Sequence, residues 1–212
     1  MYWFKEKGRK MKDLLISTFR DKNTNAAKFR EASEKLAAIL AGEAAEYLEK
    51  KKMKIETPEG SAEGVVLDKD LVLVPILRSG VGLLTTFLKF YPKANVGFVG
   101  LRRDEKTAIA KLYYSKLPKI SKETDILLLD PMIATGGSGR DALRIIKKAG
   151  AEESKITFVA VIAAEDGIAA VKKEFPKINI IVAQVDKELN VKKFIVPGLG
   201  DFGDRYFGTP EE

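Results

Sequence analysis

The residues best suited to chemistry follow an apolar run at positions 126–129. Asp130 ends that run, and the small residues Thr-Gly-Gly-Ser stand at positions 135–138, just before a helical pattern. A loop of small residues that enters a helix exposes backbone N–H groups to which the helix dipole attracts an anion. A carboxylate accepts hydrogen bonds from sugar hydroxyls. The pattern predicts a site for a phosphorylated sugar; the structural alternative is a capped, glycine-rich helix entry.

Two further segments carry groups that suit anions or tight turns. Arg78 follows the apolar run at 71–76 and stands beside Gly80 and Gly82, where its guanidinium could hold a phosphoryl group by two hydrogen bonds. Residues 197–208 contain four glycines and two aspartates. This segment is a third candidate for the site; the structural alternative is a set of tight turns with a surface ion pair. The spacing at 130–139 fits neither the Walker A loop nor the dinucleotide-binding glycine motif.

Two residue types are missing, and their absence limits the chemistry. The chain has no cysteine and no histidine. This excludes disulfides, thiol nucleophiles, Ser-His-Asp triads and zinc sites built on His or Cys. Any reaction must therefore use carboxylates, Lys, Arg, Tyr, hydroxyls, backbone dipoles or a borrowed metal ion. We expect catalysis by electrostatic positioning.

Short, continuous apolar runs alternate with helical patterns over most of the chain. The runs are too continuous for strands with one wet face, which predicts strands buried on both faces. Alternation of strand and helix predicts a mostly parallel sheet with helices on both faces, an α/β fold whose ligands bind beyond the carboxyl ends of the strands. The predicted strands are residues 71–76, 96–99, 125–129, 156–162 and 178–183, and the helices are residues 81–90, 140–149 and 167–175.

The remaining segments decorate this sheet. Residues 1–55 have a helical pattern, interrupted at 21–24 and clearest from 25 to 48. Residues 54–67 predict a β-hairpin that turns at Pro58-Glu-Gly60. A polar excursion at 102–118 carries two tyrosines. Both extensions are candidates for a hood, and we expect residues 104–118 to cover the site; the alternative makes Tyr113 and Tyr114 ordinary strand aromatics.

Length and charge place the chain among intracellular globular proteins. The 212 residues suit one domain, and 45% hydrophobic content with 32% charged residues is typical of a soluble fold. No apolar run approaches a membrane span, and the N-terminus lacks a secretory signal, so we expect a cytoplasmic protein without a membrane partner. The net charge of +7 would suit a polyanion, but the scattered lysines argue against a nucleic-acid surface.

Taken together, these segments resemble the uracil phosphoribosyltransferases, a family with the type I phosphoribosyltransferase fold. Residues 126–138 are similar to that superfamily's ribose-phosphate signature, with Pro131 where most members have a second acid. Residues 196–209 resemble the family's uracil-reading segment, and residues 19–24 resemble its N-terminal stretch. The resemblance covers the chain from about residue 14 to the end, which we treat as a single phosphoribosyltransferase domain with a uracil-reading segment at 186–212.

The resemblance implies conversion of uracil and 5-phospho-α-D-ribose 1-diphosphate (phosphoribosyl pyrophosphate) to UMP and pyrophosphate, in pyrimidine salvage. It implies magnesium carried by the pyrophosphate, a homodimer or homotetramer and GTP as an effector. Catalytic roles are implied for Arg78, Arg103, Asp130 and Asp201. The implied contacts to phosphoribosyl pyrophosphate are Arg78, Arg103, Asp130, Pro131, Met132, Ile133, Ala134, Thr135, Gly136, Gly137, Ser138 and Asp201, and those to uracil are Ile195, Gly200, Asp201 and Phe202, largely through backbone groups.

The sequence also departs from the family pattern. Phe202 stands where many bacterial relatives have Ala, and we expect its larger ring to narrow the base pocket. Arg102 adjoins Arg103, and we assign the pyrophosphate to Arg103 because it directly precedes Asp104. The histidine often found near the family's N-terminus is missing, which leaves the response to GTP open. Two other functions remain: an RNA-binding regulator of pyrimidine genes on the same fold, and a purine phosphoribosyltransferase.

Overall fold

A computed structural model describes residues 3–103 and 110–209 of the chain. Its first half begins with two helices, α1 (Trp3–Arg20) and α2 (Ala26–Ala44), and a 3-10 turn, η1 (Ala45–Tyr47). A two-stranded hairpin follows, made of β1 (Lys50–Thr57) and β2 (Gly60–Leu67). The break between α1 and α2 lies where the sequence predicts it. The side chain of Asn25 caps α2 by accepting a hydrogen bond from the Lys28 N–H.

The central sheet has the strand order β10-β9-β7-β3-β5-β6. Every neighbouring pair is parallel except β5 and β6, and two short strands, β4 and β8, add to β3 and β9. This confirms the predicted mostly parallel sheet. The strands are β3 (Leu71–Leu77), β4 (Asn95–Val96), β5 (Phe98–Arg103), β6 (Ala110–Lys116), β7 (Asp125–Leu129), β8 (Met132–Ile133), β9 (Ile156–Ala164) and β10 (Asn179–Asp186).

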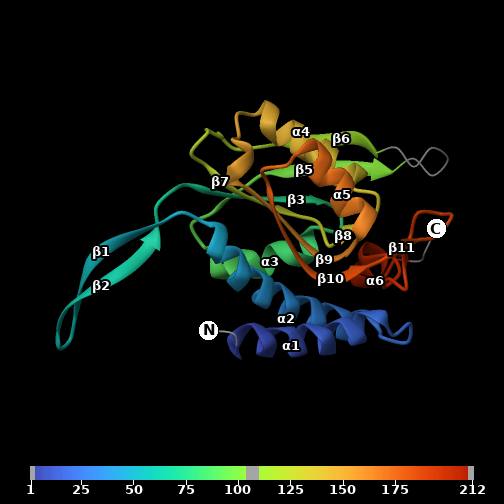
Figure 1. The fold of residues 1–212 in the computed structure, drawn as a ribbon, viewed down its shortest axis with the longest axis horizontal. Coiled ribbons are helices and arrows are strands. Elements are labelled where there is room, and N and C mark those ends of the chain that lie inside the picture. The colour runs from blue at the N-terminus through green and yellow to red at the C-terminus, as the bar shows by residue number, and fades with distance from the viewer. Residues whose placement is uncertain (1–2, 104–109, 210–212) are drawn as a thin grey trace.

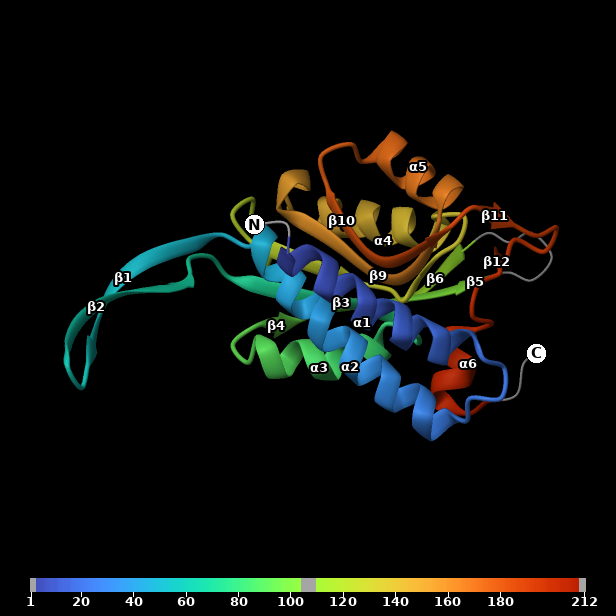
Figure 2. The same ribbon diagram turned by 60° about the horizontal axis from the view of Figure 1, so that its bottom comes forward.

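Helices cover both faces of the sheet (Figure 1). α1, α2 and α3 (Val81–Phe90) lie on one face, and α4 (Gly137–Lys148) and α5 (Glu165–Glu174) lie on the other. A 3-10 turn, η2 (Glu153–Lys155), leads into β9. The chain ends in a small antiparallel pair, β11 (Glu188–Leu189) and β12 (Ile195–Val196), and a short helix, α6 (Phe202–Phe207). Figure 2 shows α6 beside the α1–α2 turn.

Alternate residues of the central strands fill two separate cores. Leu71 and Leu73 of β3 pack with α2 and α3, whereas Val72 and Val74 pack with the residues of α4. β7 and β9 are buried along their whole length. Because both faces are covered, these strands need apolar residues at every position, which explains their continuous apolar runs. The sequence also predicts burial on both faces for the strand at 178–183, and this was wrong. That strand, β10, is an edge strand that is only half-buried over much of its length.

The N-terminal helical segment is shorter than predicted. It ends at Tyr47, and residues 50–55 belong to strand β1 rather than to a helix. One lysine of β1 has a cross-strand partner there: Lys52 Nζ lies 2.8 Å from Glu63 Oε1. The pattern of charged residues at 50–55 fits an exposed strand as well as an exposed helix, so it did not reveal the change.

The β1–β2 hairpin does not form the hood expected from the sequence (Figure 1). The β1–β2 hairpin projects away from the sheet on the side where β3 begins, opposite to α6 (Figure 1). Residues 110–116 form strand β6, whose pairing with β5 shifts register between Gly100 and Leu101, so Tyr113 and Tyr114 are strand residues, as the alternative predicted. Residues 104–109 of the predicted cover lie outside the described residues. Among the helices of the described ranges, none has both the length and the apolarity needed to cross a membrane.

Candidate active site

Three segments meet beyond the carboxyl ends of the parallel strands. They are the β3–α3 turn at 78–82, the β7–α4 loop at 130–138 and the C-terminal segment at 195–204. A Cβ atom at Gly80 would lie 2.4 Å from the Leu129 carbonyl oxygen, so the first two segments touch through their backbones. A Cβ atom at Gly203 would lie 2.9 Å from Ser79 Oγ, which places the third segment against the first.

Asp130 stands at the end of β7 with only 9% of its surface exposed. Its Oδ1 accepts a long hydrogen bond of 3.4 Å from the Met132 N–H. Burial raises the pKa of Asp130 to about 7, and the nearby charge of Asp201 adds to this increase, whereas the Met132 N–H opposes it. A carboxylate with one weak donor retains lone pairs for the hydroxyl groups of a ligand.

The segment after Asp130 divides into a core part and a loop part. Met132 and Ile133 form β8 on β9, and Ile133 is only 1% exposed, so this part anchors the segment in the core. Gly136 then adopts a left-handed φ of +75° and caps α4. A Cβ atom at Gly136 would lie 2.8 Å from the Gly167 carbonyl oxygen, so only glycine fits this turn without displacement.

The entry to α4 is arranged as an anion site would require. Thr135 Oγ1 accepts a 3.4 Å hydrogen bond from the Gly137 N–H, and α4 begins at that glycine. Gly139 lies so close to Phe158 that a Cβ atom would approach a ring carbon to 2.4 Å. The close packing fixes the first turn of α4, where N–H groups lack acceptors within the helix, at the end of the sheet that holds Asp130.

Arg78 leaves the end of β3 and points to the C-terminal segment. Its Nη2 donates a 3.1 Å hydrogen bond to Asp204 Oδ1, and its guanidinium carbon lies 5.9 Å from the centre of the Phe207 ring. The side chain is 61% exposed, so it can reach a ligand from the surface. Arg103 ends β5, but its side chain lies outside the described residues.

Asp186 fixes the turn of the C-terminal segment. Its buried carboxylate accepts hydrogen bonds from the Gly198 N–H (2.9 Å) and from Arg20 Nη2 (2.7 Å). Gly198 and Gly200 both have left-handed φ values, of +62° and +77°, and the Val196–Pro197 peptide is cis. The turn therefore holds the backbone of residues 195–201 at the same end of the sheet as Asp130.

Comparison with known proteins places this arrangement in a family. The model of the uracil phosphoribosyltransferase family matches residues 8–209. The chain is 45% identical over 195 residues to a uracil phosphoribosyltransferase of Geobacillus sp. (strain WCH70), covering 92% of each chain. It belongs to the uracil phosphoribosyltransferase family. The same values hold for a uracil phosphoribosyltransferase of Bacillus cereus (strain B4264).

A solved structure supports the fold. The AQ2163 protein from Aquifex aeolicus is 36% identical and superimposes with a TM-score of 0.87, covering 95% of this chain and 96% of that one. The fold of this chain therefore has a counterpart among solved structures over nearly its whole length.

The ring of Phe202 does not lie where it is expected from the sequence, at the base pocket. Its side chain has no exposed surface and packs among aromatic rings, 5.1 Å from the Phe29 ring centre and 5.8 Å from that of Tyr206. The ring therefore cannot narrow an open base pocket, and the prediction that it does was wrong. Ile195 is also buried, with 5% of its surface exposed.

The residues that hold the C-terminal segment in place could not be recognised in the sequence. Arg205 donates hydrogen bonds to the backbone carbonyls of Phe19, Leu199 (2.7 Å) and Asp21 (2.7 Å). Its guanidinium carbon also lies 4.7 Å from the centre of the Phe29 ring. A lone arginine in a sequence gives no sign of such partners. Only the fold shows that the N-terminal helices brace this segment.

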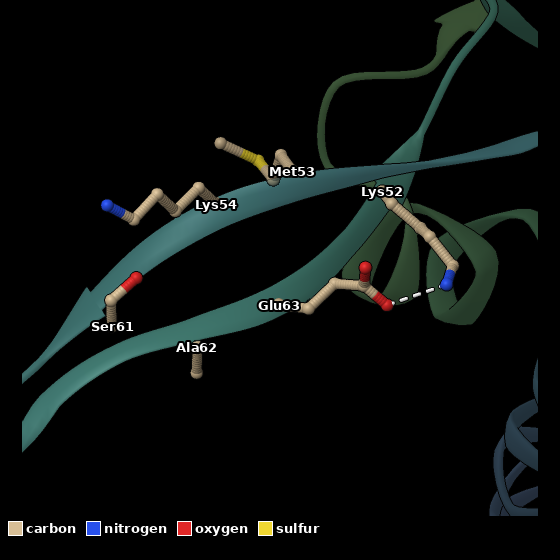
Figure 3. A pocket seen from close by; sticks show the side chains of 6 residues that line it. All are labelled: Lys52, Met53, Lys54, Ser61, Ala62 and Glu63. Atoms are coloured by element: carbon tan, nitrogen blue, oxygen red, sulfur yellow. Dashed lines mark ion pairs between the residues drawn. The ribbon is translucent and has the colours of Figure 1, made fainter.

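Two surface hollows lie outside the three segments. One is on the hairpin, lined by Lys52, Met53, Lys54, Ser61, Ala62 and Glu63 (Figure 3). The other runs along β10 and α5 and includes Tyr47 and Val185. Neither contains a candidate site residue, and neither has the convergent charged groups that a phosphorylated substrate needs. The carboxyl ends of the parallel strands are therefore the better candidate for the active site.

Proposed function

We propose that this protein is a uracil phosphoribosyltransferase, which transfers the phosphoribosyl group of phosphoribosyl pyrophosphate to N1 of uracil. The observation that carries the proposal is the 45% identity over 92% of the chain to curated uracil phosphoribosyltransferases. The meeting of an anion-binding loop, an arginine and a glycine-rich turn at one end of the sheet supports it. The three segments match the three parts of the substrate pair: sugar phosphate, pyrophosphate and base.

The sugar phosphate would bind at the β7–α4 loop. In this proposal the 5-phosphate accepts hydrogen bonds from the backbone N–H groups of residues 134–138, where the α4 dipole favours negative charge. Asp130 accepts hydrogen bonds from the ribose hydroxyls. Because those hydroxyls would favour the ionised carboxylate, substrate binding should lower the raised pKa of Asp130.

The pyrophosphate would lie between arginines. Arg78 and Arg103 supply planar N–H donors that match phosphoryl oxygens; Arg78 follows β3, and Arg103 ends the neighbouring parallel strand β5. Their interactions strengthen as charge builds on the leaving group, which lowers the barrier. Losing one such donor should cost a factor of about 100 to 1,000 in turnover.

Magnesium fits this site as an ion brought by the substrate. Among the described residues, no three acidic side chains gather in the way that a resident cation site requires. Magnesium is often held by one or two carboxylates together with substrate phosphates, and the charge of Asp201 is near enough to Asp130 to raise the pKa of Asp130. When bound, the ion would offset negative charge on the pyrophosphate.

The base would be read by the backbone of Ile195 and of residues 200–202. Uracil has two carbonyl acceptors with an N–H donor between them, and fixed peptide groups can match that pattern. Cytosine would place an amine where a donor already points, and one unmatched buried group costs about 1 to 3 kcal/mol. The turn fixed by Asp186 keeps these peptide groups in place.

In the reaction, the bond from ribose C1 to the pyrophosphate oxygen breaks while the bond from C1 to uracil N1 forms. The electron pair leaves with pyrophosphate, the ribose passes through an oxocarbenium-like transition state, and the N1 proton is released. No histidine or covalent nucleophile is needed, in agreement with a chain that has neither histidine nor cysteine.

A cover over the site, for which residues 104–118 stay our prediction, would exclude water. Unchanged hydrogen exchange there on substrate binding would contradict this part.

An assay of pyrophosphate release tests the function. We expect release with uracil and magnesium, and little with cytosine, hypoxanthine or adenine. Preference for a purine would contradict the proposal. An RNA-binding regulator would instead bind RNA with a steep salt dependence, which we do not expect of an enzyme.

Two variants test the assigned site. Asp130→Asn should keep the fold but weaken binding of phosphoribosyl pyrophosphate, and Arg103→Ala should chiefly slow turnover. Asp68→Asn, at the base of the hairpin, is the control and should behave as wild type. Normal kinetics in both site variants would show that the site is misplaced.

We further propose a cytoplasmic homodimer or homotetramer with GTP as an effector. This rests only on membership of the family. Light scattering would give the assembly size. Pyrophosphate release with and without GTP would show the effector response, and identical rates would remove GTP from the proposal.

A further inference from the structure

The ion pair between Arg78 and Asp204 joins two segments with different proposed tasks. Arg78 ends the strand that leads to the pyrophosphate site, whereas Asp204 lies on α6, directly after the base-reading residues. Their atoms Nη2 and Oδ1 are 3.1 Å apart, although 126 residues separate them in sequence. The side chain of Asp204 is 16% exposed and that of Arg78 is 61% exposed. The aspartate is thus the more fixed partner.

Asp204 is held on several sides. Thr209 Oγ1 donates a 2.6 Å hydrogen bond to the same Oδ1 that accepts from Arg78. The Asp204 N–H donates to Asp201 Oδ1 at 2.8 Å, and its carbonyl oxygen accepts from the Gly208 and Thr209 N–H groups. The carboxylate therefore has a defined position before any ligand arrives.

The two segments also pack directly on each other. A Cβ atom at Gly82 would lie 2.9 Å from a ring carbon of Phe202, and Gly203 sits equally close to Ser79. Glycine at both positions lets α6 rest on the β3–α3 turn. A shift of either segment would therefore be transmitted to the other by contact.

We infer that Asp204 is a positioning residue that orients Arg78 toward the pyrophosphate of the substrate. Arginine carries five N–H donors, so an ion pair through Nη2 leaves others for the phosphoryl oxygens. An exposed pair of this kind adds little to stability, so its main effect falls on orientation. The inference rests on the proposed function, because it takes pyrophosphate as the ligand of Arg78.

Steady-state kinetics of two variants test this role. Asp204→Ala should raise the KM for phosphoribosyl pyrophosphate about tenfold, the size of a lost hydrogen bond to a charged group, while the KM for uracil changes less than about twofold. Asp204→Asn retains the carbonyl acceptor and should stay within about threefold of wild type. A merely structural role would loosen α6 and raise both KM values together, and that result would overturn the inference.

A double-mutant cycle shows whether Asp204 acts through Arg78. In the Arg78→Ala background, Asp204→Ala should have almost no further effect on the KM for phosphoribosyl pyrophosphate. Full additivity of the two effects would refute the inference. Asp68→Ala is the matched control: it removes another ion-paired aspartate, 3.3 Å from Lys51 Nζ, outside the three segments. It should leave both KM values unchanged.

Calorimetric binding of inorganic pyrophosphate separates this inference from the proposed function. If the wild type makes no UMP, the proposed function fails, but weaker pyrophosphate binding by Asp204→Ala would still support the positioning role. If the wild type is active and Asp204→Ala binds pyrophosphate as tightly as wild type, the inference fails alone. Absence of pyrophosphate binding by the wild type would also overturn it. If Asp204→Ala does not fold, Thr209→Val should raise the same dissociation constant, and an unchanged value would count against us.

Discussion

Replacing Asp130 by Asn should make the protein more stable at alkaline pH. Burial raises the pKa of Asp130 to about 7 from its ordinary value of 3.8. At about 1.4 kcal/mol for each pKa unit, ionising this buried group costs the folded state about 4 kcal/mol at most. The amide variant does not bear that cost, although burying an amide retains part of it. We therefore expect a gain of about 2 kcal/mol at pH 8.

The sign of the effect follows from proton binding. Between the unfolded pKa of 3.8 and the folded pKa of about 7, the folded state binds more protons than the unfolded state, so this group's contribution to stability falls as pH rises. Well below pH 3.8 the carboxyl group is protonated in both states, so the Asn variant loses its advantage there and bears only the cost of its buried amide. The advantage of the variant should grow from pH 4 to pH 8.

Urea unfolding at a series of pH values and fixed protein concentration measures this difference. Asp68→Asn is the control, because Lys51 and Lys69 lower the pKa of Asp68 and give the opposite pH trend. A stability difference between Asp130→Asn and wild type that does not change with pH would refute the reasoning. Asp130→Asn should also bind phosphoribosyl pyrophosphate less well than wild type. Together with its greater stability, that result would show that the wild type keeps a destabilising buried carboxylate because substrate binding needs it.

Four more variants test the positions around the site. Gly136→Ala should lower stability by about 1 to 2 kcal/mol and weaken phosphoribosyl pyrophosphate binding, because of its left-handed φ and its close approach to a carbonyl oxygen, whereas Gly137→Ala has room and should be milder; thermal melting and calorimetry compare them. Phe202→Ala should cost about 3 to 5 kcal/mol in urea unfolding through a core cavity, with no selective effect on uracil. Asp186→Ala should raise the KM for uracil more than that for phosphoribosyl pyrophosphate, since it releases Gly198, and equal changes would refute its role.

The sheet could be predicted from the sequence because its physics is local and strong. Strands buried on both faces require continuous apolar runs, and β7 begins and ends at the predicted residues. α3 also has its predicted bounds, because its apolar pattern begins after the turn that follows β3 and ends before Tyr91. The loop after Asp130 was found because glycine and a helix start are visible in sequence.

The parts that could not be predicted depend on partners far along the chain. β1 carries exposed lysines that suit a helix or a strand, and only its pairing with β2 decides between them. Phe202 was expected beside the base because its neighbours are. Its ring instead lies among Phe19 and Phe29, which the sequence places more than 170 residues away. The contacts of Arg205 were invisible for the same reason.

The clamp formed by Arg205 has a consequence for the order of folding. It ties α6 to the backbone carbonyls of Phe19 and Asp21, which lie 186 and 184 residues earlier in the sequence. Closing so long a loop costs conformational entropy before the contacts compensate for it, so these contacts should form late. The C-terminal segment should therefore become ordered only after the sheet has assembled.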